Sequence, residues 1–372
     1  MLYRLFFVSC FVLVSLFLLE NSQRNLWGAT PEPVVDDTTA WFDAAQMPLY
    51  GKGWTDTNTP FTRIPQRAQK SIPASVWSLS QHSAGVSVRF KTDSPTILAK
   101  HELNNPQSMS HMTIAGSSGL DLYGKDDNDV WRWAGSGRSN DAAYTSTLLS
   151  NAPAKWREYI IYLPLYNSTK SLSIGIPKQY KLEAVELPKE KPVFYYGTSI
   201  AHGCSASRPG YTVPAILERR LSVPVINFGF SGSGKMEPEM EKLIEEVDAS
   251  VFVLDCLPNM SPQQVEERTE PFIRALRSKY PNTPIIMIEG PKYCYAWIQP
   301  EWTKKWEEQN KHYRAAFEKL TKEEVKNLYY IEGEKLYGED GDGAVDGVHP
   351  SDLGMFRNAE VLFPVFKKIL GK

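Results

Sequence analysis

A serine, a histidine and an aspartate in this chain stand in settings suited to nucleophilic catalysis. Ser199 follows a short apolar run and a glycine, in Tyr-Gly-Thr-Ser-Ile-Ala, so its hydroxyl is expected at the end of a strand, near helix N–H groups. His349 ends the loop sequence Asp-Gly-Val-His, in which the Asp346 carboxylate can accept a hydrogen bond from the second ring nitrogen. A serine nucleophile needs a base of near-neutral pKa that is oriented by an acid, and these residues predict such a triad. Ala201 excludes the G-x-S-x-G elbow.

Two further segments could donate hydrogen bonds to an oxyanion. Gly232 lies in Gly-Phe-Ser-Gly-Ser-Gly after an apolar run, where its backbone N–H could approach a ligand closely. The spacing is not G-x-G-x-x-G and no G-K-S/T follows, which disfavours a nucleotide loop and leaves a tight turn as the other interpretation. Asn259 follows the next apolar run and could donate from its side-chain amide. Alternatively, Asn259 or Ser261 could cap the helix that follows.

Other residues near these segments are candidates for binding a substrate. His202 comes three residues after Ser199, and we interpret it as part of the pocket wall rather than as a second base. Tyr293 and Trp297 belong to an aromatic-rich stretch, residues 292–302, that could line a sugar-binding cleft or pack between domains. No zinc site is predicted for three histidines that lack the H-x-H and H-E-x-x-H spacings: His82, His101 and His111.

The elements that must position these residues fall into two patterns. Up to about residue 187, runs such as 85–90 and 171–176 alternate with period two between turn residues, which predicts an antiparallel β-sandwich, jelly-roll-like, over residues 40–187. Residues 188–372 alternate apolar strands with amphipathic helices, which predicts a doubly wound, flavodoxin-like parallel sheet covered on both faces. Strands are expected at 193–196, 223–228, 250–254, 284–288 and 327–331, with helices at 213–221, 237–247, 262–280, 304–320 and 351–370.

The fold class expected is therefore α/β with an N-terminal β domain. Ser199, Gly232 and Asn259 follow the first three strands of the parallel sheet. The carboxyl ends of such strands form the ligand-binding edge, so the three residues should lie close together there.

The composition and the N-terminal residues limit the classes of function that this chain can have. The chain has 372 residues, 42% hydrophobic and 23% charged, with a net charge of -2 and no clustered basic field, so no nucleic-acid partner is expected. Arg4 precedes an apolar run of about 15 residues, which favours a secretory signal over a spanning helix, although an uncleaved anchor remains open. Residues 1–28 are thus expected to export the protein, to the outside or the periplasm. The remaining cysteines could form one disulfide, and the sequence does not choose the pair: Cys204, Cys256 and Cys294.

The motifs in chain order resemble the conserved blocks of SGNH hydrolases, also called GDSL-like lipases and acylhydrolases. Ser199, Gly232 and Asn259 are similar to the first three residue blocks, and Asp346 with His349 to the last. This chain has Gly-Thr-Ser where many members have Gly-Asp-Ser. The N-terminal part resembles the companion domain of one subgroup, whose G-x-D-L-Y motif is similar to Gly-Leu-Asp-Leu-Tyr at residues 119–123; residues 76–85 are also similar.

The resemblance implies an esterase that needs no metal or cofactor. Ser199 would attack an ester carbonyl and His349 would take its proton, while the backbone N–H groups of Ser199 and Gly232 and the Asn259 amide would hold the oxyanion. Short-chain acyl esters, acetyl above all, are the expected substrates, free or on a polysaccharide. Two alternatives stay open: a secreted carbohydrate-binding protein with an inactive hydrolase fold, and an acyltransferase that uses the same triad.

Overall fold

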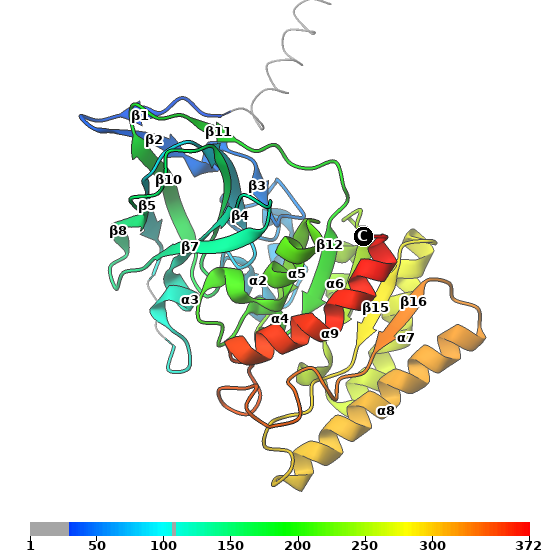
Figure 1. The fold of residues 1–372 in the computed structure, drawn as a ribbon. Coiled ribbons are helices and arrows are strands. Elements are labelled where there is room, and N and C mark those ends of the chain that lie inside the picture. Colours follow the sequence, from blue (N-terminus) through cyan, green and yellow to red (C-terminus); the bar gives the residue numbers. More distant parts are fainter. Residues whose placement is uncertain (1–29, 106–108) are drawn as a thin grey trace, which may run out of the picture.

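The computed structural model describes residues 30–105 and 109–372 (Figure 1). The predicted signal or anchor, residues 1–28, lies outside the described residues, and export stays a prediction. Within the described ranges, no helix is long and apolar enough to cross a bilayer.

Two antiparallel sheets form the N-terminal part of the described chain. The sequence forms these sheets because apolar and polar residues alternate along the strands. In β5 (Ile97–Leu103), for example, every second side chain is buried in the core and the others face outward. Residues from both sheets, among them Phe90 and Ile174, meet in one buried apolar cluster. The first sheet has the order β1 (Val34–Val35), β2 (Thr39–Asp43), β10 (Thr169–Pro177), β5, β8 (Ala143–Leu149). The second has the order β11 (Leu182–Ala184), β4 (Ser87–Thr92), β9 (Arg157–Tyr162), β6 (Leu120–Lys125), β7 (Trp131–Gly137), and β3 (Leu49–Tyr50) pairs with β4.

The C-terminal part is built on a parallel sheet, as the sequence predicted. Its strand order is β13 (Val225–Gly229), β12 (Val193–Gly197), β14 (Val251–Asp255), β15 (Ile285–Ile288), β16 (Leu328–Ile331). The chain runs from β12 to β13 on one side and then crosses to β14 on the other. The order of connection therefore reverses at the carboxyl end of β12, where parallel sheets of this type bind ligands.

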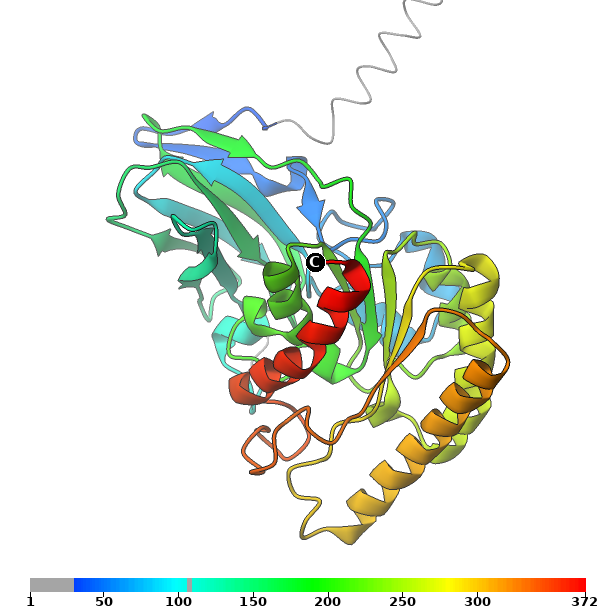
Figure 2. The same ribbon diagram turned by 45° about the vertical axis from the view of Figure 1, so that its right-hand side comes forward.

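Helices cover both faces of this sheet, and the strands are apolar on both sides for that reason. In β12, Val193 and Tyr195 pack toward α5 (Val213–Leu221) and α9 (Asp352–Leu370), while Phe194 and Tyr196 pack toward the other face. That second face is covered by α6 (Pro238–Ile244), α7 (Pro262–Lys279) and α8 (Pro300–Lys322), and Figure 2 shows α9 and α8 on opposite sides of the sheet. Shorter helical turns complete the described chain: η1 (Ala44–Gln46), η2 (Gln66–Lys70), α2 (Ala74–Ser80), α3 (Ile114–Ser118), α4 (Ser199–His202), η3 (Pro209–Tyr211) and η4 (Leu257–Asn259).

Part of the N-terminal chain, between β3 and β4, packs on the parallel sheet instead of on the β-sheet whose strands it connects. The apolar side chains of Trp54, Ile64 and Val76 belong to the same buried cluster as Phe194 of β12. A sequence boundary at residue 187 therefore does not separate the cores, because the segment between β3 and β4 contributes to the C-terminal one.

A buried arginine holds this segment in place. Arg63 is 2% exposed, and its guanidinium donates to the carbonyl oxygens of His82 (3.1 Å) and Leu79 (2.7 Å). It also donates to the carbonyl oxygens of Asn227 (3.2 Å) and Gly229 (2.9 Å) on β13. One side chain thus satisfies acceptors in both parts of the molecule.

We predict that Arg63→Met lowers the free energy of unfolding by about 3 kcal/mol or more, because each buried carbonyl left without a donor costs about 1 kcal/mol or more. Chemical denaturation of the full chain measures this loss. The matched control is Arg67→Met, whose exposed guanidinium pairs with Asp56 and Glu246 and should contribute less than about 1 kcal/mol. Equal losses in the two variants would contradict the bridging role of Arg63.

Candidate active site

The strand β12 leads into a narrow turn that carries Ser199. The Thr198 hydroxyl accepts from the N–H of Ile200, and Ser199 begins the single-turn helix α4. Gly197 must be a glycine, because a Cβ there would lie 2.7 Å from the Cβ of Ala201. The serine is 7% exposed, so only a small part of it reaches the surface at the carboxyl edge of the sheet.

The predicted nucleophile, base and acid lie in hydrogen-bond contact. The Ser199 Oγ lies 3.0 Å from Nε2 of His349, and Nδ1 of the same ring lies 2.7 Å from Oδ2 of Asp346. The other carboxylate oxygen, Oδ1, accepts from the backbone N–H groups of His349 (2.7 Å) and Val348 (3.0 Å). Asp346 therefore fixes both the imidazole and the loop that carries it.

The surroundings shift the pKa values of the acid and the base in opposite directions. Burial alone would raise the pKa of Asp346, but the hydrogen bonds from the ring and backbone of His349 and from Val348 lower it to about 2. Burial alone would lower the pKa of His349, but the neighbouring Cys204 thiol and the Asp346 carboxylate together raise it to about 9. Asp346 thus stays ionised at neutral pH and favours the imidazolium that forms when His349 takes a proton.

The two predicted oxyanion donors lie on loops that contact each other. Gly232 has a φ of +69°, and no atom lies within 4 Å of the position that its Cβ would take, so one side of its backbone is open. Asn259, at the end of η4, donates from its side-chain amide to the carbonyl oxygen of Ser233 at 2.7 Å. An amide nitrogen has a second N–H, which leaves one donor for another acceptor. The cap of α7 is Ser261, in a capping box with Gln264, and not Asn259.

The structure places His202 in the core, which argues against its predicted contact with substrate. The ring has no exposed surface, stacks on Tyr166 at a centroid distance of 4.2 Å and contacts the carbonyl oxygen of Leu165 through Nε2 at 2.7 Å. Burial moves its pKa well below the ordinary value, so His202 stays neutral. His202 therefore contributes to the packing of the turn that carries Ser199.

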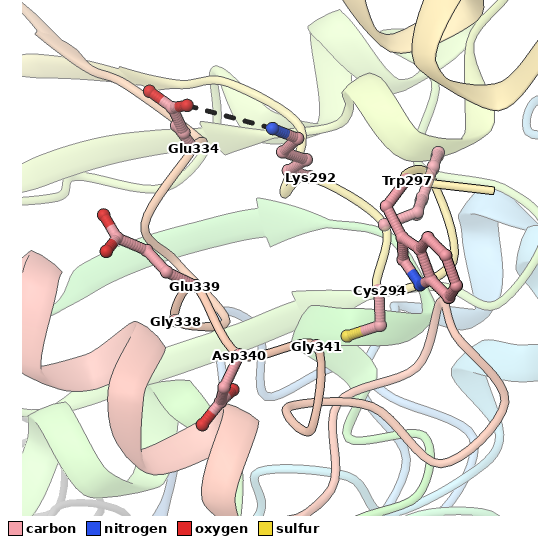
Figure 3. A pocket seen from close by; sticks show the side chains of 9 residues that line it. Lys292, Cys294, Trp297, Glu334, Gly338, Glu339, Asp340 and Gly341 are labelled. Carbon is pink, nitrogen blue, oxygen red and sulfur yellow. Dashed lines mark ion pairs between the residues drawn. The ribbon is translucent and has the colours of Figure 1, made fainter. Parts of the chain in front are cut away.

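Tyr293 and Trp297 line a pocket of about 520 Å³ between residues 292–297 and 334–341. Figure 3 shows Trp297 on one side of this pocket and the carboxylates of Glu334, Glu339 and Asp340 on the other. Trp297 is 82% exposed, whereas Tyr293 is 3% exposed and packs on Trp302. The segment that lines this pocket contacts the loop that carries His349, because the N–H of Cys294 donates to the carbonyl oxygen of Gly347 at 2.9 Å.

Two residues beside His349 were not predicted to lie there: the sequence analysis treated His111 as a histidine without zinc-ligand spacing and Cys204 as a candidate for a disulfide. Nε2 of His111 lies 3.0 Å from the Sγ of Cys204, and the rings of His111 and His349 have centroids 5.7 Å apart. Their ligand atoms, with Sγ of Cys204, all lie within 4.8 Å of one another. No local spacing could reveal this group, because His111 comes from the N-terminal part of the chain. Three cysteines are free in the described chain: Cys204, Cys256 and Cys294.

The G-x-D-L-Y aspartate links the β-sheets to the segment beneath the base. Asp121 accepts from the N–H of Gly210 at 2.9 Å and pairs with Arg208 at 3.2 Å. In the same loop, the N–H of Ser207 donates to Asp352 at 2.9 Å. Asp352 begins α9 three residues after His349, so these polar contacts connect the N-terminal sheet to the start of the helix that follows the base.

Comparisons with known proteins identify families and structures that this chain resembles. Residues 190–367 match the model of the GDSL-like lipase/acylhydrolase family, and residues 39–182 match that of the N-terminus of SGNH hydrolase-type esterases. A solved structure described as a GDSL-like lipase from Bacteroides ovatus is 36% identical, covers 90% of this chain and 98% of its own, and superposes with a TM-score of 0.85.

Two more distant structures share the fold. A salicylyl-acyltransferase from a tetracycline biosynthetic pathway is 18% identical over 91% of this chain and 96% of its own, with a TM-score of 0.67. A family two carbohydrate esterase from Clostridium thermocellum, solved with cellohexaose, is 15% identical over 77% of this chain and 93% of its own, with a TM-score of 0.51. No curated protein matches the chain.

The electrostatics of the base predict the pH dependence of activity. Only neutral His349 can accept a proton, and its pKa is raised from 6.5 to about 9, so kcat/KM should rise with pH and reach half its maximum well above pH 6.5. Cys204→Ser removes one of the groups that raise the pKa of His349. The acid limb of the profile, in which kcat/KM rises with pH, should therefore move to lower pH. Cys294→Ser is the control and should leave the limb in place. An acid limb at or below pH 6.5 in the wild-type enzyme would contradict this electrostatic account.

Proposed function

Because the chain belongs to the GDSL-like lipase/acylhydrolase family and is an ester-hydrolysing enzyme, we propose that Ser199, His349 and Asp346 are its catalytic triad. The observation that carries the proposal is the unbroken hydrogen-bonded chain from the serine hydroxyl through the imidazole to the carboxylate. All three residue types are present and in contact, which argues against an inactive, purely carbohydrate-binding protein.

In the acylation step, the Ser199 oxygen attacks the ester carbonyl while its proton passes to Nε2 of His349. Asp346 keeps the other ring proton on Nδ1, so that the Nε2 lone pair faces the serine. The carbonyl π bond opens to an oxyanion, which the N–H groups of Ser199 and Gly232 and the amide of Asn259 stabilise. Collapse of this intermediate expels the alcohol, which leaves with the proton from His349.

In the deacylation step, water takes the place of the alcohol. His349 removes a proton from the water as its oxygen attacks the acyl-enzyme, and the same donors hold the second oxyanion. The Ser199 oxygen then leaves with that proton, and the acid is released. Each step returns His349 to its neutral state, and the second step restores the Ser199 hydroxyl, so the cycle needs no external acid or base.

We propose that the substrate is a short-chain acyl ester, acetyl above all, carried on a carbohydrate. Two observations support the carbohydrate part of this proposal. Trp297 is exposed and offers an apolar face on which a sugar ring can pack, and a carbohydrate esterase solved with cellohexaose shares the fold. Hydrolysis of such an ester releases a small acid and leaves the sugar hydroxyl free.

Acyl transfer is the second candidate, because a salicylyl-acyltransferase shares the fold along nearly the whole chain. An alcohol would then take the place of water in the second step. Product analysis with a sugar acceptor present separates the two reactions: free acid alone indicates hydrolysis, and an acylated acceptor indicates transfer.

We also propose that residues 40–187 form a jelly-roll domain and residues 188–372 the catalytic domain. The support is the strand order β2-β10-β5-β8 in one sheet and β4-β9-β6-β7 in the other, an eight-stranded, two-sheet arrangement of that type. The segment between β3 and β4, which packs on the catalytic side, is where the two proposed domains interlock.

Ser199→Ala should lower the hydrolysis of p-nitrophenyl acetate by about 10³-fold or more, because no nucleophile remains and only the oxyanion donors act. The rate of p-nitrophenol release measures this, and an unchanged unfolding midpoint shows that the variant is folded. Ser139→Ala, in an exposed loop, is the matched control. Undiminished turnover in Ser199→Ala would remove Ser199 from the mechanism.

Trp297→Ala should raise KM for acetylated oligosaccharides about tenfold, and leave kcat/KM for p-nitrophenyl acetate nearly unchanged, because only the longer substrate reaches the indole. Initial rates with both substrates check this. Trp156→Ala removes another exposed indole, on the N-terminal part, and should change neither value. Loss of activity on both substrates in Trp297→Ala would contradict a sugar-binding role.

A further inference from the structure

A second set of reactive side chains surrounds the base. His111 precedes α3, Cys204 follows α4 and His349 precedes α9, so three distant segments bring a thiol and two imidazoles together. Their ligand atoms lie within 4.8 Å of one another, and the closest contact is 3.0 Å, between Nε2 of His111 and Sγ of Cys204.

The backbone holds these side chains where they are. The N–H of Cys204 donates to the carbonyl oxygen of Ser199 at 2.9 Å, so the thiol is fixed relative to the nucleophile. The loop of His111 is docked on the same turn, where the hydroxyl of Thr113 donates to the carbonyl oxygen of Ser207. Cys204 is 2% exposed, while His111 and His349 are partly exposed. The thiol is therefore buried, and the two imidazoles lie nearer the surface. We call the group of His111, Cys204 and His349 the cup.

Sulfur and imidazole nitrogen are the ligands that zinc prefers in proteins. With metal–ligand bonds of about 2.0–2.3 Å, the ligand atoms of a tetrahedral site lie about 3.3–3.8 Å apart. The three atoms here need to move by about 1 Å or less to reach those separations. Three protein ligands leave one position of the tetrahedron for water.

Only one nitrogen of His349 is available to such an ion. Nδ1 is engaged by Asp346, which leaves Nε2, the atom that contacts the Ser199 hydroxyl. A metal ion and the serine proton therefore compete for the same lone pair.

We propose that His111, Cys204 and His349 bind a zinc-type divalent cation that switches the enzyme off. On binding, the Cys204 S–H bond is replaced by an S–Zn bond and the proton goes to solvent. Nε2 of His349 and one nitrogen of His111 give their lone pairs to the ion, no redox change occurs, and Ser199 keeps its proton. Removal of the ion restores the base. The inhibition rests on the proposed triad, whereas the binding does not.

Zinc chloride titrated into the full chain by isothermal titration calorimetry tests the binding directly. One ion per chain is expected, with affinity reduced at least tenfold in both His111→Ala and Cys204→Ser. His312→Ala and Cys294→Ser remove the same residue types outside the cup and should bind zinc like the wild type. Cobalt chloride should produce a thiolate-to-cobalt charge-transfer band that Cys204→Ser lacks. Absence of binding, or equal affinity in all variants, would overturn the site.

Esterase assays at the same zinc concentrations test the switch. The wild-type rate should fall with the occupancy measured by calorimetry and recover on addition of EDTA, and His111→Ala, compared with its own zinc-free rate, should need at least tenfold more zinc. Stoichiometric binding without inhibition would refute the switch. Calorimetry on Ser199→Ala keeps the two proposals separate, because zinc should still bind there even if the assignment of Ser199 as nucleophile fails.

Discussion

The hydrogen bond between Ser199 and His349 is the constraint on which the rest of the structure depends. It joins atoms 150 residues apart in sequence, so the first strand of the parallel sheet and the loop before the last helix must end at one edge. The nucleophile turn has little room: a Cβ at Gly197 would meet Ala201, and one at Gly234 would lie 2.0 Å from the carbonyl oxygen of Gly197. Side chains at either position would displace the serine from its base. The glycines therefore serve the triad although they carry no reactive group.

The N-terminal sheets take part in this constraint. Asp121 holds the loop that contains Arg208 and Gly210, and that loop holds Asp352 at the start of the helix after His349. On the opposite side, Arg63 ties its segment to the strand that precedes the glycine loop. Two independent connections thus fix the loops of the site relative to the β-sheets. A domain that only tethered the enzyme to a glycan would not need such contacts, which indicates a supporting role for the β-sheets.

The resemblance of the motifs predicted the family, whereas the parallel sheet and the three residues now seen in contact were predicted for a physical reason. Carboxyl ends of parallel strands meet at one edge, and Asp346 and His349 share one short loop, so the geometry follows from chain order. His202 was misjudged because it is the last residue of the single helical turn α4 and its ring stacks inward, on Tyr166. The approach of His111 to Cys204 depends on how the two parts of the molecule pack, and no local pattern records that.

The central claim is that Ser199 is the residue that becomes acylated. Treatment of the purified protein with a fluorophosphonate, followed by peptide mass spectrometry, tests it most directly, because the reagent reacts much faster with a serine that an adjacent base activates than with an ordinary hydroxyl. The account predicts one adduct per chain, on the Ser199 hydroxyl. An adduct on a different residue, or an unmodified protein that still hydrolyses esters, would contradict it.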